Sequence, residues 1–208
     1  MTPDNPFLQA LLAEPDDDTL RLALADWLDE NGQPARAEFV RVQIELARGG
    51  SSYYRRCRLE LRQRDLLVAH DAEWVAPIAR VLHCRPGEWG GWVFRRGFAE
   101  YFRLPAHTLV SCGAQLSRLT PVRELNLVYD PMGGGSQDYL WREPWLRSVT
   151  HLYGVGLDDE GAAALLDSPH LTGLRVLDCH WDQLDTHLQR RLVKQFGHAL
   201  PSGRGVPT

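Results

Sequence analysis

A leucine pattern that returns about every 25 residues constrains the fold of this chain more than any other feature of its sequence. The segments that begin at Val122, Val149 and Leu174 start 27 and 25 residues apart, and each carries a leucine three positions later. Segments 157–171 and 184–196 follow the second and third of them with helical spacing. The order L-x-x-L-x-L, loop, helix is typical of a leucine-rich repeat, whose turns bury their apolar side by stacking.

The residues between the leucines form the first candidate site. In a repeat of this kind the leucines point into the stack, and the intervening side chains project from the concave sheet. These side chains belong to Glu124, Asn126, His151, Tyr153, Val176 and Asp178. Their mixture of polar and aromatic groups is typical of a protein-recognition surface, and open repeat faces usually serve recognition. The alternative is that they are solvated strand residues of a small stack, since the binding hypothesis depends on analogy between folds.

The segment 24–48, "LADWLDENGQPARAEFVRVQIELAR", predicts a helical hairpin. Asn31-Gly32 suits a helix C-terminus, and Pro34 suits the first turn of the next helix. The preceding acidic residues 16–18 suit a helix N-terminus. Apolar residues fall on one stripe of the first hairpin helix: Leu20, Ala23, Leu24, Trp27 and Leu28. We therefore expect Trp27 to anchor the hairpin core rather than to form a reactive centre with its neighbouring aspartate.

The chain changes character in the loop 83–92, which contains Pro-Gly and Gly-Gly pairs. Before the loop, residues 53–82 predict a third long helix with a break near Pro77. After it, residues 92–104 are rich in aromatic and β-favouring residues, with a bulge or bend at Gly97.

This change of character predicts two domains in an α/β fold. An N-terminal α-helical module at 1–90 would pack on a short leucine-rich-repeat-like β/α solenoid at 91–208. Residues 98–104, followed by the helix-like stretch 107–116, would form a first, degenerate turn. Three turns are recognisable, which is near the minimum for a stable stack.

Arginines form the second candidate site. Arg55, Arg58 and Arg62 share a face of the third helix, and Arg95 and Arg96 follow on a strand. Such a stripe is a possible nucleic-acid-binding surface. Acidic residues interrupt it, and the chain has a net charge of -4, so this hypothesis stands second. Arg95 and Arg96 could instead pair with the acidic first helices.

Two further charge arrangements leave alternatives open. Glu38, Arg41 and Glu45 lie along one side of the second hairpin helix, either as a partner-binding surface or as ordinary pairs along the helix. An enzyme site near Arg95, Arg96 and His151 is a third functional hypothesis, which would require a deep pocket with perturbed ionisable groups.

Several functional classes find no support in the sequence. No nucleophile, zinc-protease or phosphate-loop motif occurs, so we expect a protein that is not an enzyme and needs no cofactor. The four cysteines form no C-x-x-C pair, which argues against a disulfide framework or a metal site. No apolar run approaches the ~20 residues of a membrane span. The first residues lack the features of a signal peptide, which predicts a cytoplasmic protein.

The N-terminal part resembles a known bacterial family, the repeat-companion domain that precedes leucine-rich or other repeats. The resemblance covers roughly residues 7–104 and is carried by D-W-L, a Gly-Pro turn, A-E-F-x-R-x-Q-x-E-L and F-R-R-G-F, in this order. Leu24 stands where members usually have tyrosine before A-D-W-L, which keeps an apolar residue at that place. The resemblance implies the architecture of a helical module followed by repeats, and it implies no particular activity.

Overall fold

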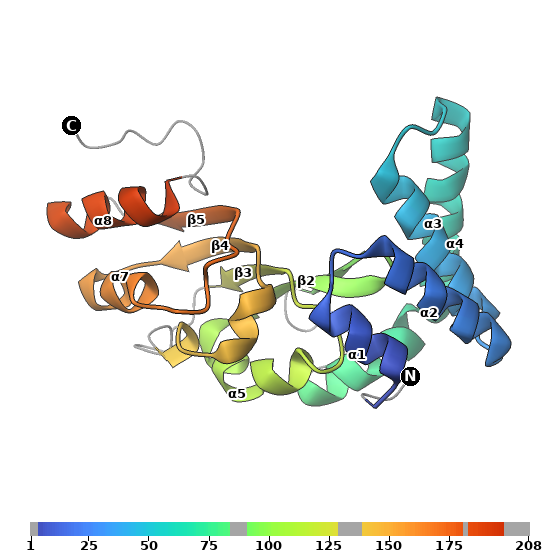
Figure 1. Ribbon diagram of the computed structural model, residues 1–208, viewed down its shortest axis with the longest axis horizontal. Coiled ribbons are helices and arrows are strands. Elements are labelled where there is room, and N and C mark those ends of the chain that lie inside the picture. The colour runs from blue at the N-terminus through green and yellow to red at the C-terminus, as the bar shows by residue number, and fades with distance from the viewer. Residues whose placement is uncertain (1–3, 84–90, 129–138, 181–182, 198–208) are drawn as a thin grey trace. The chain divides into compact units, whose positions relative to one another are not determined.

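The computed structural model describes residues 4–83, 91–128, 139–180 and 183–197 (Figure 1). The chain divides into two compact units. The first comprises Met1–Pro86, Trp92–Glu100 and Arg118–Pro121, and the second comprises Gly87–Gly91, Tyr101–Ser117 and Val122–Thr208.

Four helices build most of the first unit: α1 (Pro6–Ala13), α2 (Asp18–Glu30), α3 (Pro34–Arg48) and α4 (Tyr53–Val81). Their ends follow the local signals in the sequence. The side chain of Asp17 accepts a hydrogen bond from the backbone of Thr19 at the start of α2. Gly32 has a φ of 74° just after the end of α2, and Pro34 is the first residue of α3. The predicted hairpin of α2 and α3 is therefore confirmed.

Two details of these helices differ from the predictions. The buried stripe of α2 is turned by one residue, so that Arg21 lies fully inside while Leu20, Ala23 and Trp27 are half-buried. The break predicted at Pro77 is absent, since α4 continues to Val81 with the proline inside it. Ile78, directly after the proline, is buried, and the helix continues despite the backbone hydrogen bond that Pro77 cannot make.

A hairpin of two strands contributes its first strand and the first residues of its second strand to the first unit. β1 (Trp92–Arg95) and β2 (Phe98–Pro105) are joined by Arg96 and Gly97, with φ of 47° and 93°. Two positive φ angles match the twist of a tight hairpin, so the bend predicted at Gly97 is a two-residue turn. A Cβ on Gly97 would lie 2.6 Å from Cγ2 of Val40, so the turn sits directly on α3.

Strands and helices alternate through the second unit (Figure 1). After β2 come α5 (Ala106–Leu116), β3 (Glu124–Val128), the 3-10 helix η1 (Pro144–Ser148), β4 (His151–Gly156), α7 (Asp159–Leu166), β5 (Val176–His180) and α8 (Thr186–Phe196). The strands form one sheet in the order β1-β2-β3-β4-β5, and β2 to β5 run parallel. The predicted α/β fold is thereby confirmed.

The repeated leucines occupy equivalent places in this sheet. Leu125 pairs with Leu152, which pairs with Leu177 on the next strand, and all three are fully buried. The glycine-rich sequence at 131–138 predicts a loop, and these residues lie outside the described ranges. Gly113 in α5 is packed against Trp145, because a Cβ at this glycine would lie 2.2 Å from the indole ring.

A buried ion pair ties α2 to β2 within the first unit. Nη2 of Arg21 donates to Glu100 at 2.5 Å and to the carbonyl of Pro15 at 2.6 Å, and Nη1 donates to the carbonyl of Arg96 at 2.9 Å. The side chains of Arg21 and Glu100 are 0% and 4% exposed. Burial lowers the pKa of Arg21, and the charge of Glu100 opposes that effect.

We expect Arg21→Met to lower the free energy of unfolding by about 3–5 kcal/mol, because Glu100 would keep a buried charge without its main partner. Urea denaturation followed by circular dichroism measures the change. The double variant Arg21→Met/Glu100→Leu should recover most of the loss, since it removes both charges. A double variant as unstable as the single one would contradict this account.

Gly113→Ala should also destabilise the protein, although alanine is the better helix former. The clash with Trp145 should cost about 1–3 kcal/mol, as overpacking of a well-filled core usually does. Thermal unfolding measures the change, with Gly113→Ala/Trp145→Leu as the matched relief of the clash. An increase in stability of the single variant would show that α5 and the indole are not in close contact.

Candidate functional site

The six residues predicted to project from the repeat sheet do lie on one face of it. Along β3, β4 and β5 half-buried positions alternate with the buried leucines. Glu124 pairs with His151, and His151 pairs with Val176, while Asn126 pairs with Tyr153. Asp178 shares their face because it stands two residues after Val176 on β5.

The strand order explains why this face differs from the one that carries the leucines. Neighbouring parallel strands follow one another in sequence, and their crossover connections are almost always right-handed. All such connections then lie on the same side of the sheet. The leucines point to that side, so the helices α5 and α7 cover the leucines rather than the six residues of the opposite face.

His151 and Tyr153 form the aromatic part of this face. Their rings stack with centroids 6.2 Å apart and an interplanar angle of 24°. Oγ1 of Thr150 lies 2.9 Å from Nδ1 of His151 and holds the imidazole in place. A register shift between Leu152 and Val155 follows, which alters the direction of the side chains at this point of β4.

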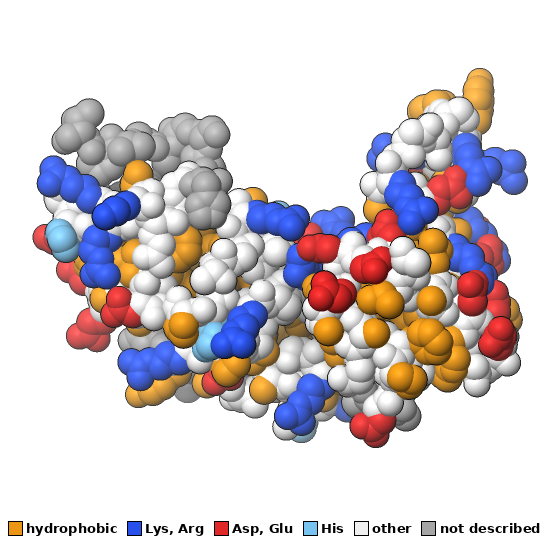
Figure 2. Space-filling model, in the orientation of Figure 1, with side chains coloured by type: hydrophobic (Ala, Val, Ile, Leu, Met, Phe, Trp, Pro, Cys, Tyr) orange, Lys and Arg blue, Asp and Glu red, His pale blue; other side chains and the backbone are white. Residues whose placement is uncertain are grey.

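The arginines of α4 are engaged by glutamates of α3. Nε and Nη2 of Arg62 donate to the carboxylate of Glu38, at 2.6 Å each, and Arg55 binds Glu45. Arg41 reaches across to Asp26 and Asp29 of α2. The charges of α3 therefore pair with other helices instead of along their own helix. Figure 2 shows the resulting mixture of acidic and basic side chains over these helices.

Arg58 is the member of the stripe that makes no hydrogen bond or ion pair with a described residue. Tyr53 and Tyr54 lie at the same end of α4, are 75% and 81% exposed, and contact each other edge to face. An exposed aromatic pair beside an arginine can stack on a nucleic-acid base.

Arg95 and Arg96 have different surroundings. Arg96 approaches Asp16 at 3.3 Å, Asp18 at 3.8 Å and Glu100 at 3.6 Å, so it does pair with the acidic start of α2. Arg95 is exposed on β1. Both arginines belong to the first unit, whereas His151 belongs to the second.

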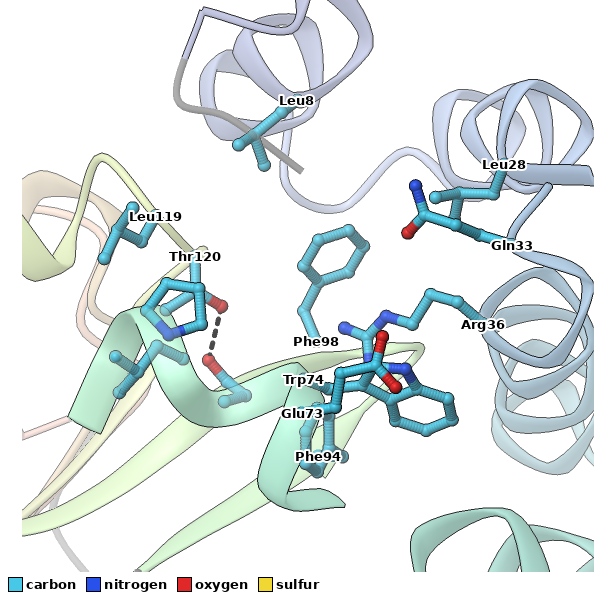
Figure 3. Close-up of a pocket in the computed structure, with 13 residues that line it drawn as sticks. Leu8, Leu28, Gln33, Arg36, Glu73, Trp74, Phe94, Phe98, Leu119 and Thr120 are labelled. Carbon is cyan, nitrogen blue, oxygen red and sulfur yellow. Dashed lines mark hydrogen bonds between the residues drawn. The ribbon is translucent and has the colours of Figure 1, made fainter. Parts of the chain in front are cut away.

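A pocket in the first unit was not foreseen from the sequence. It has a volume of about 110 Å³, and Arg36 of α3 points into it (Figure 3). Nη2 of Arg36 donates to the carbonyl of Gly97 at 2.6 Å, and its guanidinium carbon lies 4.6 Å from the centre of the Trp74 ring. The rings of Phe94 and Phe98 lie 5.2 and 5.6 Å away.

One signal in the sequence could have located both buried arginines. Arg36 stands four residues before Val40 and seven before Gln43, which are both buried on α3. Arg21 stands at the same intervals before buried residues of α2. An arginine on the apolar stripe of a helix must find acceptors or aromatic rings inside, so it marks a buried polar site.

Metal binding and membrane crossing each require a recognisable arrangement of residues. Among them, no group of His, Cys, Asp and Glu side chains has an arrangement that could hold a metal ion. No helix in the described part of the chain combines the length and the apolar character needed to cross a membrane.

The chain matches no protein-family model, no curated protein and no solved structure. Its function is therefore inferred from the geometry of the described residues.

The ion pair between Glu38 of α3 and Arg62 of α4 leads to a prediction about the pKa of Glu38. Hydrogen bonds from Arg62 hold the pKa of Glu38 below its usual range, and partial burial opposes them. A lowered carboxyl pKa stabilises the fold above the unfolded-state pKa, and this contribution is lost as pH falls through the folded-state value. Arg62→Gln should therefore raise the pKa of Glu38, measured by carboxyl-carbon NMR. Arg58→Gln is the control and should leave that pKa unchanged; equal pKa values in both variants would disprove the pairing.

Proposed function

We propose that this chain is a non-catalytic cytoplasmic adaptor, which binds another protein through the outer face of β3, β4 and β5. In this proposal residues 91–208 act as a short leucine-rich-repeat-like solenoid, and residues 1–90 act as its repeat-companion module. The main support is that six side chains from three parallel strands, five of them polar or aromatic and the sixth that of Val176, lie on the sheet face opposite the leucines.

The chemistry of this face suits recognition of a protein surface. His151 and Tyr153 provide stacked rings, and aromatic residues are enriched among those that dominate binding energy. Glu124 and Asp178 supply acceptors on either side, which favours a partner with basic or amide groups. The parallel strands fix the spacing of these groups, so little ordering is needed on binding.

The cytoplasmic assignment has independent support. Among the described residues, Cys57, Cys112 and Cys179 form no disulfide. Cysteines outside disulfides are typical of a reducing compartment.

Nucleic-acid binding through the arginine stripe of α4 is the second proposal. Its support is the exposed pair of Tyr53 and Tyr54 beside Arg58. It has less support than the sheet face, because Arg55 and Arg62 already neutralise glutamates of α3.

A pull-down from nuclease-treated native lysate compares the two surfaces. We expect His151→Ala/Tyr153→Ala to lose a specific protein partner by at least about tenfold, since truncation of two central aromatic residues typically costs several kcal/mol of binding. The partner is then purified, and its affinity for the wild-type protein and the variant is measured by calorimetry.

Tyr53→Ala/Tyr54→Ala is the matched control, because it also removes two exposed rings but from α4. It should retain the partner. Loss of the partner in this control but not in the sheet variant would favour the nucleic-acid proposal instead. A partner that is captured only from lysate without nuclease would favour it too.

A further inference from the structure

The guanidinium group of Arg36 has a donor nitrogen that no described residue uses. Nη2 donates to Gly97, whereas Nη1 is buried and lacks a hydrogen-bond partner among the described residues. A buried N–H without an acceptor is unfavourable, since it has lost water and gained nothing in return. Nη1 is therefore a donor whose acceptor the described residues do not supply.

The charge of Arg36 is also incompletely balanced. Burial lowers its pKa to about 9, and the negative charges of Glu73 and Asp71 oppose this effect. The side chain remains a cation at neutral pH. Glu73 lines the pocket, but its carboxylate lies 3.5 Å from His70 and its side chain is 76% exposed. An anion inside the pocket would thus meet a desolvated cation, while Glu73 faces mainly solvent.

Most of the other residues that line the pocket have apolar side chains, with Gln33 and Thr120 as polar exceptions. The apolar walls are formed in part by Leu8, Leu28, Pro77, Ile78, Phe98 and Leu119 (Figure 3). The volume of about 110 Å³ is several times the roughly 10–15 Å³ that a single water requires on a comparable measure. A small organic molecule with a hydrocarbon part fits these walls better than isolated water does.

We propose that this pocket binds a small monocarboxylate with a short hydrocarbon tail, and that Nη1 of Arg36 donates to the carboxylate. The planar guanidinium matches the geometry of a carboxylate, and the leucine and phenylalanine side chains enclose the tail. The amide of Gln33 lines the same pocket and offers a second donor. This site lies in the first unit and is independent of the protein-binding face proposed for the second.

A phosphate is a poorer ligand for this pocket than a monocarboxylate. Arg36 is the sole cationic side chain among its described lining residues, and Glu73 adds a negative charge. A dianion would meet more repulsion there and would gain nothing from the apolar walls. A free short-chain acid and the C-terminal residue of a peptide share the favoured chemistry.

The test is a titration of the full chain with sodium butyrate at constant ionic strength and neutral pH, followed by NMR. The reporter is the indole N–H signal of Trp74, identified by comparison with Trp74→Phe, because this ring lies against Arg36. We expect a saturable shift with a dissociation constant on the order of 1 mM, which is reasonable for so small a ligand. Butyramide and inorganic phosphate should give no saturable shift.

N-acetylleucine and its amide distinguish the two sources of the carboxylate. Tighter binding of N-acetylleucine than of butyrate, with no binding of the amide, would identify a peptide C-terminus. Weaker binding of N-acetylleucine would identify a free short-chain acid. Either result supports a carboxylate site.

Variants test the role of the guanidinium. Arg36→Met should weaken butyrate binding by about tenfold or more. Arg41→Met is its control on the same helix, since Arg41 pairs with aspartates at the surface and should not matter. Glu73→Gln should tighten binding by about twofold to fivefold, because it removes a negative charge beside the pocket.

The proposal is overturned if butyramide or phosphate shifts the Trp74 signal as butyrate does, or if folded Arg36→Met binds butyrate normally. Should Arg36→Met fail to fold, Glu73→Gln decides, because the side chain of Glu73 is exposed and its substitution should leave the core unchanged. An unchanged affinity for butyrate in Glu73→Gln would then show that the charge of the pocket does not select the ligand.

Discussion

Arg21 is held inside the first unit by acceptors that come from three separate places in the chain. Two are backbone carbonyls, of Pro15 and Arg96, and the third is the carboxylate of Glu100. A guanidinium without such partners could not remain buried, because the loss of hydration would exceed any gain from packing. The start of α2 and the β1–β2 hairpin therefore have to form together, and the helices of this unit are arranged around that requirement.

Arg36 follows the same principle with a different outcome. One of its nitrogens binds the carbonyl of Gly97 in the hairpin turn, and aromatic rings surround the guanidinium. The second nitrogen has no partner among the described residues. Arg21 and Arg36 thus contact the same turn. Each has one buried nitrogen without a partner among the described residues, Nε of Arg21 and Nη1 of Arg36, and Arg36 adjoins the pocket.

The second unit depends on a simpler constraint. Each parallel strand has a leucine-bearing face that must be covered and an opposite face that its own crossover connections cannot reach. Leu125, Leu152 and Leu177 fill the first face, and the stacked rings of His151 and Tyr153 belong to the second. The regular repeat therefore separates the residues that pack in the core from those on the opposite face of the sheet.

Local signals in the sequence determined where most elements begin and end and which side of each strand is buried. Asp17, Gly32 and Pro34 act within a few residues of their own positions, and alternating leucines specify a face whatever the strand packs against. Tertiary structure alone decided the partners of the charged groups. The sequence left open whether the charges of α3 bind a partner or pair along that helix, whereas Glu38 and Glu45 bind arginines of α4. The pocket at Arg36 likewise needs walls from distant segments. Periodicity records which way a side chain points, and it contains no information about which atoms from elsewhere in the chain will meet it there.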